Sequence, residues 1–176
     1  MKYLIYSLFI FILLCVDMQM QSLFFYTPLR ADLLILPAVF ASAEKKDPSF
    51  LFLAFLGGIS LDFYGAAPFG SFLFSFIVTA SLLNWAAKIF LSRDLNLKSA
   101  FLFSALGLLS ADILVMVFAR VLPHGGFSPA FGLQSAVIRM ILNLSVGLLA
   151  VLPVFVVWRF VIRVIAKMES KRLALK

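Results

Sequence analysis

The chain has 176 residues, of which 64% are hydrophobic and 13% are charged, and its formal net charge is +7. Soluble domains carry roughly a quarter charged residues, so this composition excludes an ordinary water-soluble fold. The mean hydropathy of +1.10 predicts an all-α polytopic membrane protein.

We expect one transmembrane domain, residues 1–176, built as a bundle of six membrane-spanning helices. The apolar runs that predict these spans are, in chain order, about residues 3–20, 31–43, 48–64, 69–91, 99–122 and 134–164. No signal-peptidase-type site follows the first run, so we expect a retained span. The sixth run is longer than a span needs, and its basic continuation, about residues 165–176, is expected to extend as a helical tail beyond the membrane surface.

The third and fourth predicted helices are separated only by Gly65-Ala66-Ala67-Pro68. A connection this short predicts a tight antiparallel helical hairpin. Asp62 lies in the apolar helix directly before this turn. Because a carboxylate within a membrane span costs a few kcal/mol to insert, Asp62 is a candidate functional residue.

The orientation follows from the placement of the basic residues. With the N-terminus inside, the inner side receives Lys2, Lys45, Lys46, Lys88, Arg93, Lys98, Arg159, Arg163, Lys167, Lys171, Arg172 and Lys176, and the outer side receives Arg30, Arg120 and Arg139. The positive-inside rule therefore predicts that both termini are cytoplasmic. The net charge is then explained by anionic membrane lipids, and we expect no nucleic-acid partner.

The sequence contains few residues that could act in catalysis or bind a metal ion. Its one cysteine, Cys15, excludes an internal disulfide and a cysteine-based metal site. The one histidine, His124, lies in a predicted outer loop, and there is no glycine-rich phosphate loop with a lysine. We therefore expect no catalytic residue, no metal and no cofactor.

Ionisable residues recur at one depth in the predicted spans. At 1.5 Å per residue, Asp17, Asp62 and Asp112 lie roughly 20 Å from the inner surface, and Arg139 lies about 8 Å below the outer one. Asn143 follows Arg139 by one helical turn on the same face. Three acids and one arginine are therefore predicted to share a layer in the outer half of the bilayer.

Several interpretations of this layer remain open. Arg139 could pair with Asp112 or Asp62 and fix the packing of the helices, because ionisable groups in membranes usually pair with one another. The layer could instead form a binding cavity or a proton path. A third possibility is an aspartyl dyad of Asp62 and Asp112, which requires carboxylates close enough to share a proton. Finally, one or more of these side chains could extend to the membrane surface.

A short pattern occurs twice in the chain. Gly57-x-x-Ser60-x-Asp62 is echoed by Gly107-x-x-Ser110-x-Asp112. The echo is compatible with a three-helix duplication, which transporter-like folds often show, and equally with chance similarity between apolar helices. Gly57, Gly58 and Gly107 are predicted to be sites of close helix–helix contact.

The chain resembles the MreD family, a small polytopic subunit of the bacterial rod-shape (elongation) complex. The matching features are its size, Arg30-x-Asp32-Leu-Leu at the start of the second span, the segment from Gly57 to Gly70, and Asp112 after Leu-Leu-Ser, together with the basic C-terminal end. The resemblance covers most of the chain. It implies a bacterial inner-membrane protein with a six-helix bundle similar in outline to the substrate-binding subunits of energy-coupling-factor transporters.

The resemblance also implies a non-enzymatic scaffold. Such a protein would bind the single-span partner MreC and connect MreB filaments indirectly with peptidoglycan-synthesis enzymes. In this hypothesis small residues of the hairpin let a partner helix approach, Asp62 anchors it, and Asp112 and Arg139 are further polar sites. The hairpin residues in question are Gly57, Gly58, Gly65, Pro68 and Gly70. The alternative is a substrate-binding subunit of a vitamin or small-molecule transporter, although bulky residues in span one and short, polar-poor outer loops speak against it.

Overall fold

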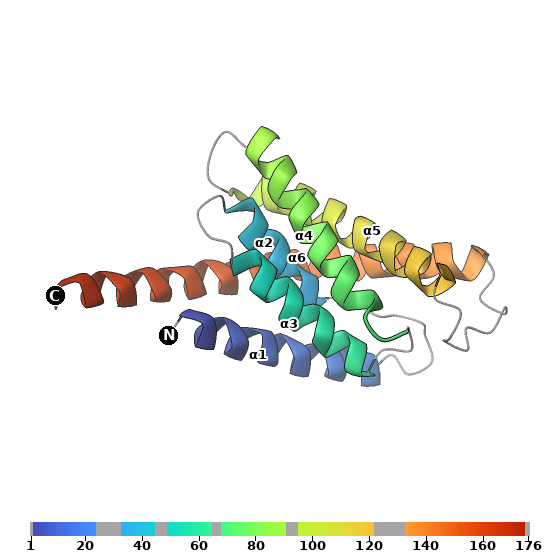
Figure 1. Ribbon diagram of the computed structural model, residues 1–176, viewed down its shortest axis with the longest axis horizontal. Coiled ribbons are helices and arrows are strands. Elements are labelled where there is room, and N and C mark those ends of the chain that lie inside the picture. The colour runs from blue at the N-terminus through green and yellow to red at the C-terminus, as the bar shows by residue number, and fades with distance from the viewer. Residues whose placement is uncertain are drawn as a thin grey trace.

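The computed structural model describes residues 2–23, 33–44, 49–64, 68–90, 95–121 and 133–174. Within these ranges the chain forms six α-helices, one 3-10 helix and no strand (Figure 1). The elements are α1 (Lys2–Leu23), η1 (Leu33–Ile35), α2 (Leu36–Ala43), α3 (Ser49–Tyr64), α4 (Ser71–Phe90), α5 (Leu97–Val121) and α6 (Leu133–Ala174). Helices α1, α4, α5 and α6 are each long and apolar enough to cross a membrane. The chain is therefore a helical, multi-pass membrane protein, as its composition predicted.

Several sequence predictions fall outside the described residues. They concern Arg30, Asp32, Gly65 and the loop that contains His124. The backbone of Arg139 belongs to α6, but its side chain is also outside the description, so the predicted ion pairs of Arg139 stay predictions.

The short helix α2 occupies the centre of the bundle. Every residue from Leu33 to Ala43 is buried. Helices α3, α4, α5 and α6 contact α2, and α1 contacts the preceding η1. At 1.5 to 2.0 Å per residue, η1 and α2 together measure about 18 Å, which is short of the roughly 30 Å of a hydrocarbon core. Enclosure by protein on all sides lets this segment end inside the bundle without exposing backbone polar groups to lipid.

Small polar residues line the inner face of α4 and let its neighbours approach. Ser71, Ser75 and Thr79 follow one another at four-residue intervals and are fully buried. Serine hydroxyls on α1 and α4 donate within their own helix, because those of Ser7, Ser75 and Ser81 each bond to the carbonyl four residues earlier, at 2.9, 2.6 and 2.7 Å. Small residues at helix contacts and hydroxyls bonded to their own helix are the pattern expected of helices that pack in lipid.

Trp158, on α6, packs against α1 and against the C-terminal end of α2. Its indole is 1% exposed and stacks on Tyr6 of α1, with ring centroids 5.8 Å apart. It also lies 6.4 Å from the ring of Phe40 in α2 and donates its Nε1–H to Glu44 at 3.4 Å. The indole therefore packs among three helices, and its one polar atom is hydrogen-bonded.

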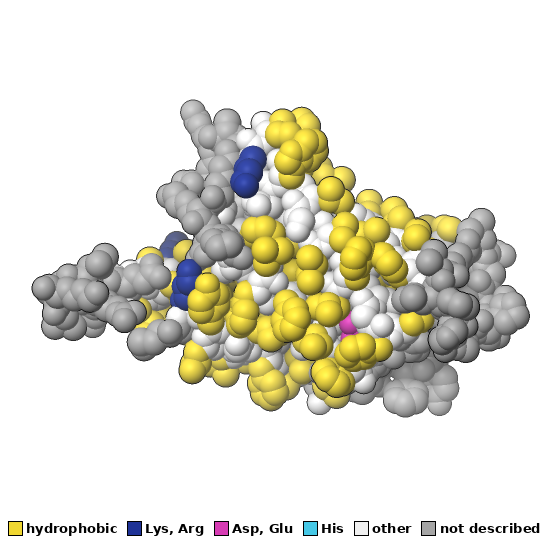
Figure 2. All heavy atoms as spheres, in the orientation of Figure 1, with side chains coloured by type: hydrophobic (Ala, Val, Ile, Leu, Met, Phe, Trp, Pro, Cys, Tyr) yellow, Lys and Arg dark blue, Asp and Glu magenta, His cyan; other side chains and the backbone are white. Residues whose placement is uncertain are grey.

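Helix α6 is 42 residues long, about 63 Å at the standard rise, and its C-terminal end projects from the bundle past the N-terminus of α1 (Figure 1). The predicted helical continuation after the sixth span is therefore present. On the face in Figure 2, the described Lys and Arg side chains lie toward the end of the molecule where α1 begins, α4 ends and α6 projects. The cytoplasmic location of both termini stays a prediction.

Candidate functional site

Asp62 caps the N-terminus of the next helix. The residue is 5% exposed, and its carboxylate lies at the first turn of α4. Oδ1 accepts the backbone N–H of Phe72 at 3.0 Å, and Oδ2 accepts that of Leu73 at 3.1 Å. The first N–H groups of a helix have no partner within it, and its N-terminus carries partial positive charge. A buried carboxylate is stabilised here by two N–H groups and by the helix dipole.

The local sequence explains why α4 takes its cap from another helix. Gly70, which precedes α4, has no side chain to offer and adopts a φ of +93°, which suits glycine. The N–H of Ser71 donates to the carbonyl of Pro68 at 3.1 Å, and that of Phe74 to Gly70 at 2.9 Å. Together with the two bonds to Asp62, these contacts satisfy the first turn. Helix α5, by contrast, is capped locally, since Asn96 Oδ1 accepts the N–H of Ser99 at 2.8 Å.

Two glycines on α3 set the distance between α3 and its neighbours. A Cβ on Gly58 would lie 2.5 Å from Cα and 2.9 Å from N of Leu73, so α3 and α4 touch backbone to backbone. A Cβ on Gly57 would lie 2.9 Å from the carbonyl oxygen of Leu34 in η1. The predicted close helix contacts are therefore present. Gly58 lies one turn before Asp62 on the same face, so this contact brings the carboxylate to α4.

These contacts show what occupies the space beside Gly57 and Gly58, two of the predicted partner-binding glycines. It is filled by this chain's own η1 and α4. Pro68 and Gly70 contribute their carbonyl groups to the start of α4. The hairpin presents different residues outward, because Phe63 and Phe69 are 72% and 64% exposed and their rings pack edge to face with centroids 5.7 Å apart.

Asp112 forms a second polar contact, between α5 and α6. The buried Asn143 donates its Nδ2–H to Asp112 Oδ1 at 3.4 Å. Two residues before Asp112, the hydroxyl of Ser110 lies 3.4 Å from that of Thr79 in α4 and donates to the carbonyl of Gly107 at 3.1 Å. The sequence placed Asn143 near the polar layer but gave the pairing role to Arg139. The periodicity of α6 was the available signal, because it puts both residues on one face.

The structure gives the three acids different surroundings. The oxygens of Asp62 face the first turn of α4, whereas a shared-proton dyad would need them to face a second carboxylate. Asp112 bonds to Asn143, and Asp17 on α1 is buried. No group of three His, Cys, Asp or Glu side chains suited to a metal ion occurs within the described part of the chain.

The repeated pattern occupies non-equivalent positions. Asp62 lies near the end of α3 and bonds to backbone, while Asp112 lies well inside α5 and bonds to a side chain. A three-helix duplication would relate the third helix to the sixth, but the second copy lies on the fifth. The placement favours chance similarity.

The chain was compared with known proteins at the level of family, sequence and structure. No protein-family model, curated protein or solved structure matches it.

We expect Asp112 and Asn143 to be energetically coupled. Asp112→Ala and Asn143→Ala should each destabilise the detergent-solubilised protein, and the double variant should lose about 1 kcal/mol less than the sum of the two, because a single shared hydrogen bond is removed once. A double-mutant cycle from chemical unfolding in micelles measures this coupling. Strictly additive losses would show that the 3.4 Å contact contributes nothing to stability.

Proposed function

We propose that this chain is a non-enzymatic, six-span scaffold of the bacterial inner membrane that helps to assemble the cell-elongation machinery, as its resemblance to the MreD family implies. Both termini are cytoplasmic in this proposal, and the principal partner is an MreC-like single-span protein. MreB filaments and peptidoglycan-synthesis enzymes join indirectly. The structure of the hairpin α3–α4 is the observation that supports a structural role.

A catalytic or transport site would use polar and small residues. In this hairpin those residues instead form contacts between α3 and α4. Asp62 accepts two backbone N–H groups, and Gly58 lies against the backbone of Leu73. The hairpin is thereby held as one unit with a defined outer surface. In lipid, such a pre-organised unit can recognise a partner helix by close packing rather than by hydrophobic burial.

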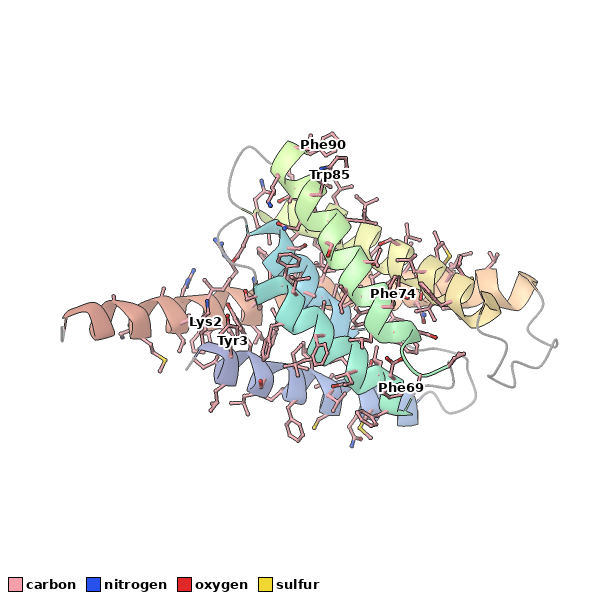
Figure 3. All side chains as sticks on the ribbon, viewed as in Figure 1. Lys2, Tyr3, Phe69, Phe74, Trp85 and Phe90 are labelled. Atoms are coloured by element: carbon pink, nitrogen blue, oxygen red, sulfur yellow. The ribbon has the colours of Figure 1, made fainter. Side chains whose placement is uncertain are left out.

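The outer end of the hairpin is the surface we assign to the partner. Phe63 and Phe69 are exposed and pack against each other, so they form a small, ordered aromatic surface, and Figure 3 shows Phe69 at the turn before α4. Asp62 acts behind them by fixing the start of α4. In this proposal the Asp62 carboxylate does not contact the partner helix but positions the hairpin that does.

Affinity capture of the tagged protein from native membranes, followed by identification of the co-purified proteins, tests this proposal. We expect a single-span, coiled-coil periplasmic protein together with wall-synthesis enzymes. Phe63→Ala with Phe69→Ala should lower recovery of the single-span protein severalfold. Trp85→Ala with Phe90→Ala is the matched control, because these exposed aromatic residues project at the opposite end of α4 (Figure 3) and should leave recovery unchanged.

The alternative function is a substrate-binding subunit of a vitamin or small-molecule transporter. The partly buried contact between Asp112 and Asn143 is the observation that favours it, since such a pair offers a ligand both a donor and an acceptor. Recovery of a pair of ATPases with a transmembrane coupling subunit in the same capture experiment would establish this alternative and overturn the scaffold proposal.

A further inference from the structure

We propose that a basic stripe on α6, formed by Arg159, Arg163 and Lys167, binds the phosphate-bearing headgroups of anionic lipids in the leaflet where α6 leaves the bilayer. All three side chains are exposed. This inference rests on the multi-pass membrane character of the chain and not on its proposed cellular role.

The stripe follows from the spacing of the residues. Arg159, Arg163 and Lys167 recur every four residues, so at about 100° per residue they lie within an arc of about 80° on one side of α6. The centre of this arc lies about 140° around the helix from the buried Trp158. The three charges thus form a single row that faces away from the bundle.

The bundle holds this row in place. Val161 and Ile165, on the opposite side of α6, are buried at the same level as the basic residues. The guanidinium carbon of Arg159 lies 5.8 Å from the centre of the Phe155 ring, a cation–π contact on the same helix. The charges are therefore presented by a packed helix, so less conformational entropy is lost when a ligand binds.

The chemical class of the ligand follows from the residues that lie on the same face of α6 one to three turns before the basic row. Leu149, Leu152 and Val156 point in the same direction as the basic row and are exposed, so this side of α6 faces acyl chains. Along the helix axis the next layer is the headgroup region, about 5 to 8 Å thick. The row spans about 12 Å, and the long side chains extend its reach toward phosphate. Continuity with the lipid-facing surface favours lipid over an acidic protein.

Native mass spectrometry of the intact, detergent-solubilised protein with added phosphatidylglycerol or phosphatidylcholine tests the proposal. We expect the wild type to bind phosphatidylglycerol preferentially. The variant Arg159→Gln, Arg163→Gln, Lys167→Gln should lose at least tenfold in affinity for phosphatidylglycerol and little for phosphatidylcholine, since each basic residue near anionic headgroups contributes about a fivefold factor.

A matched control distinguishes lipid binding at this basic stripe from a general effect of the protein's net charge. The variant Lys2→Gln, Lys88→Gln, Lys98→Gln removes the same number of charges from α1, α4 and α5, and its affinity for phosphatidylglycerol should change less than threefold. Arg159→Lys with Arg163→Lys should retain the preference, because phosphate attraction needs charge rather than a particular geometry. Thermal unfolding confirms that each variant is folded, and the single variant Arg163→Gln serves if the triple variant is not.

Three results would overturn the proposal. Equal losses in both triple variants would mean that only net charge matters. A wild type that binds both lipids equally would remove the site altogether. Unchanged lipid preference in the stripe variant, together with loss of an acidic protein from native membranes, would reassign the row to a protein partner.

Discussion

Asp62→Ala is expected to lower the free energy of unfolding by about 4 kcal/mol, because it removes both acceptors from the first turn of α4. The N–H of Phe72, which is buried, and the N–H of Leu73, which is partly buried, would lose the Asp62 oxygens as acceptors, at roughly 1 to 3 kcal/mol each. Loss of the carboxylate from the positive end of the helix dipole adds up to about 1 kcal/mol. Chemical unfolding of the purified protein in mild detergent measures the effect.

Ser71→Ala is the matched control for Asp62→Ala. Ser71 belongs to the same turn and is fully buried, and its hydroxyl has no hydrogen-bond partner among the described residues. Its removal should be neutral or slightly stabilising, since no bond is broken and an unsatisfied polar atom is eliminated. Asp62→Asn should fall between the two, because an amide offers one acceptor oxygen. If Asp62→Ala proved as stable as Ser71→Ala, the capping role would be wrong.

Gly58→Ala is expected to destabilise the protein by about 3 kcal/mol, the upper end of the range for overpacking in a well-packed core. The added Cβ would lie 2.5 Å from the Leu73 Cα, and a backbone cannot move aside as a side-chain tip can. Relieving the clash separates α3 from α4 and lengthens both hydrogen bonds to Asp62. The destabilisation should therefore be less than additive with that of Asp62→Ala.

Gly147→Ala introduces the same methyl group into another transmembrane helix. There the new Cβ meets Leu108 Cδ1 at 2.5 Å, the end of a flexible side chain that can change rotamer. The expected change in unfolding free energy is within about 1 kcal/mol of zero, because the gain in helix propensity offsets the rearrangement. Equal destabilisation by Gly58→Ala and Gly147→Ala would contradict the backbone contact between α3 and α4.

Helix positions followed closely from the sequence, because long apolar runs between charged or turn segments are a strong local signal. The runs predicted at residues 48–64 and 69–91 correspond to Ser49–Tyr64 and Ser71–Phe90. Gly57 and Gly58 could likewise be assigned to helix contacts from their place in an apolar helix. These inferences depend on residues close to one another in the chain.

The partners of the polar residues could not be predicted in the same way. The bonds from Asp62 reach residues ten and eleven positions ahead, across a turn, and depend on how closely two helices approach. A glycine before α4 in place of a capping side chain was the one available signal. The Asn143–Asp112 contact joins residues 31 positions apart, and helical periodicity gave the face of α6 but not its rotation against α5.

The position of α2 has a consequence for biogenesis. Synthesis proceeds from the N-terminus, so this segment leaves the ribosome before α3, α4, α5 and α6, the helices that enclose it. Its eleven helical residues, Leu33–Ala43, are too short to be stable alone in lipid. Helix α2 can therefore reach its buried position only after α3, α4, α5 and α6 have been inserted. A chain truncated before α6 would leave this apolar segment partly uncovered and open to degradation by membrane quality-control proteases.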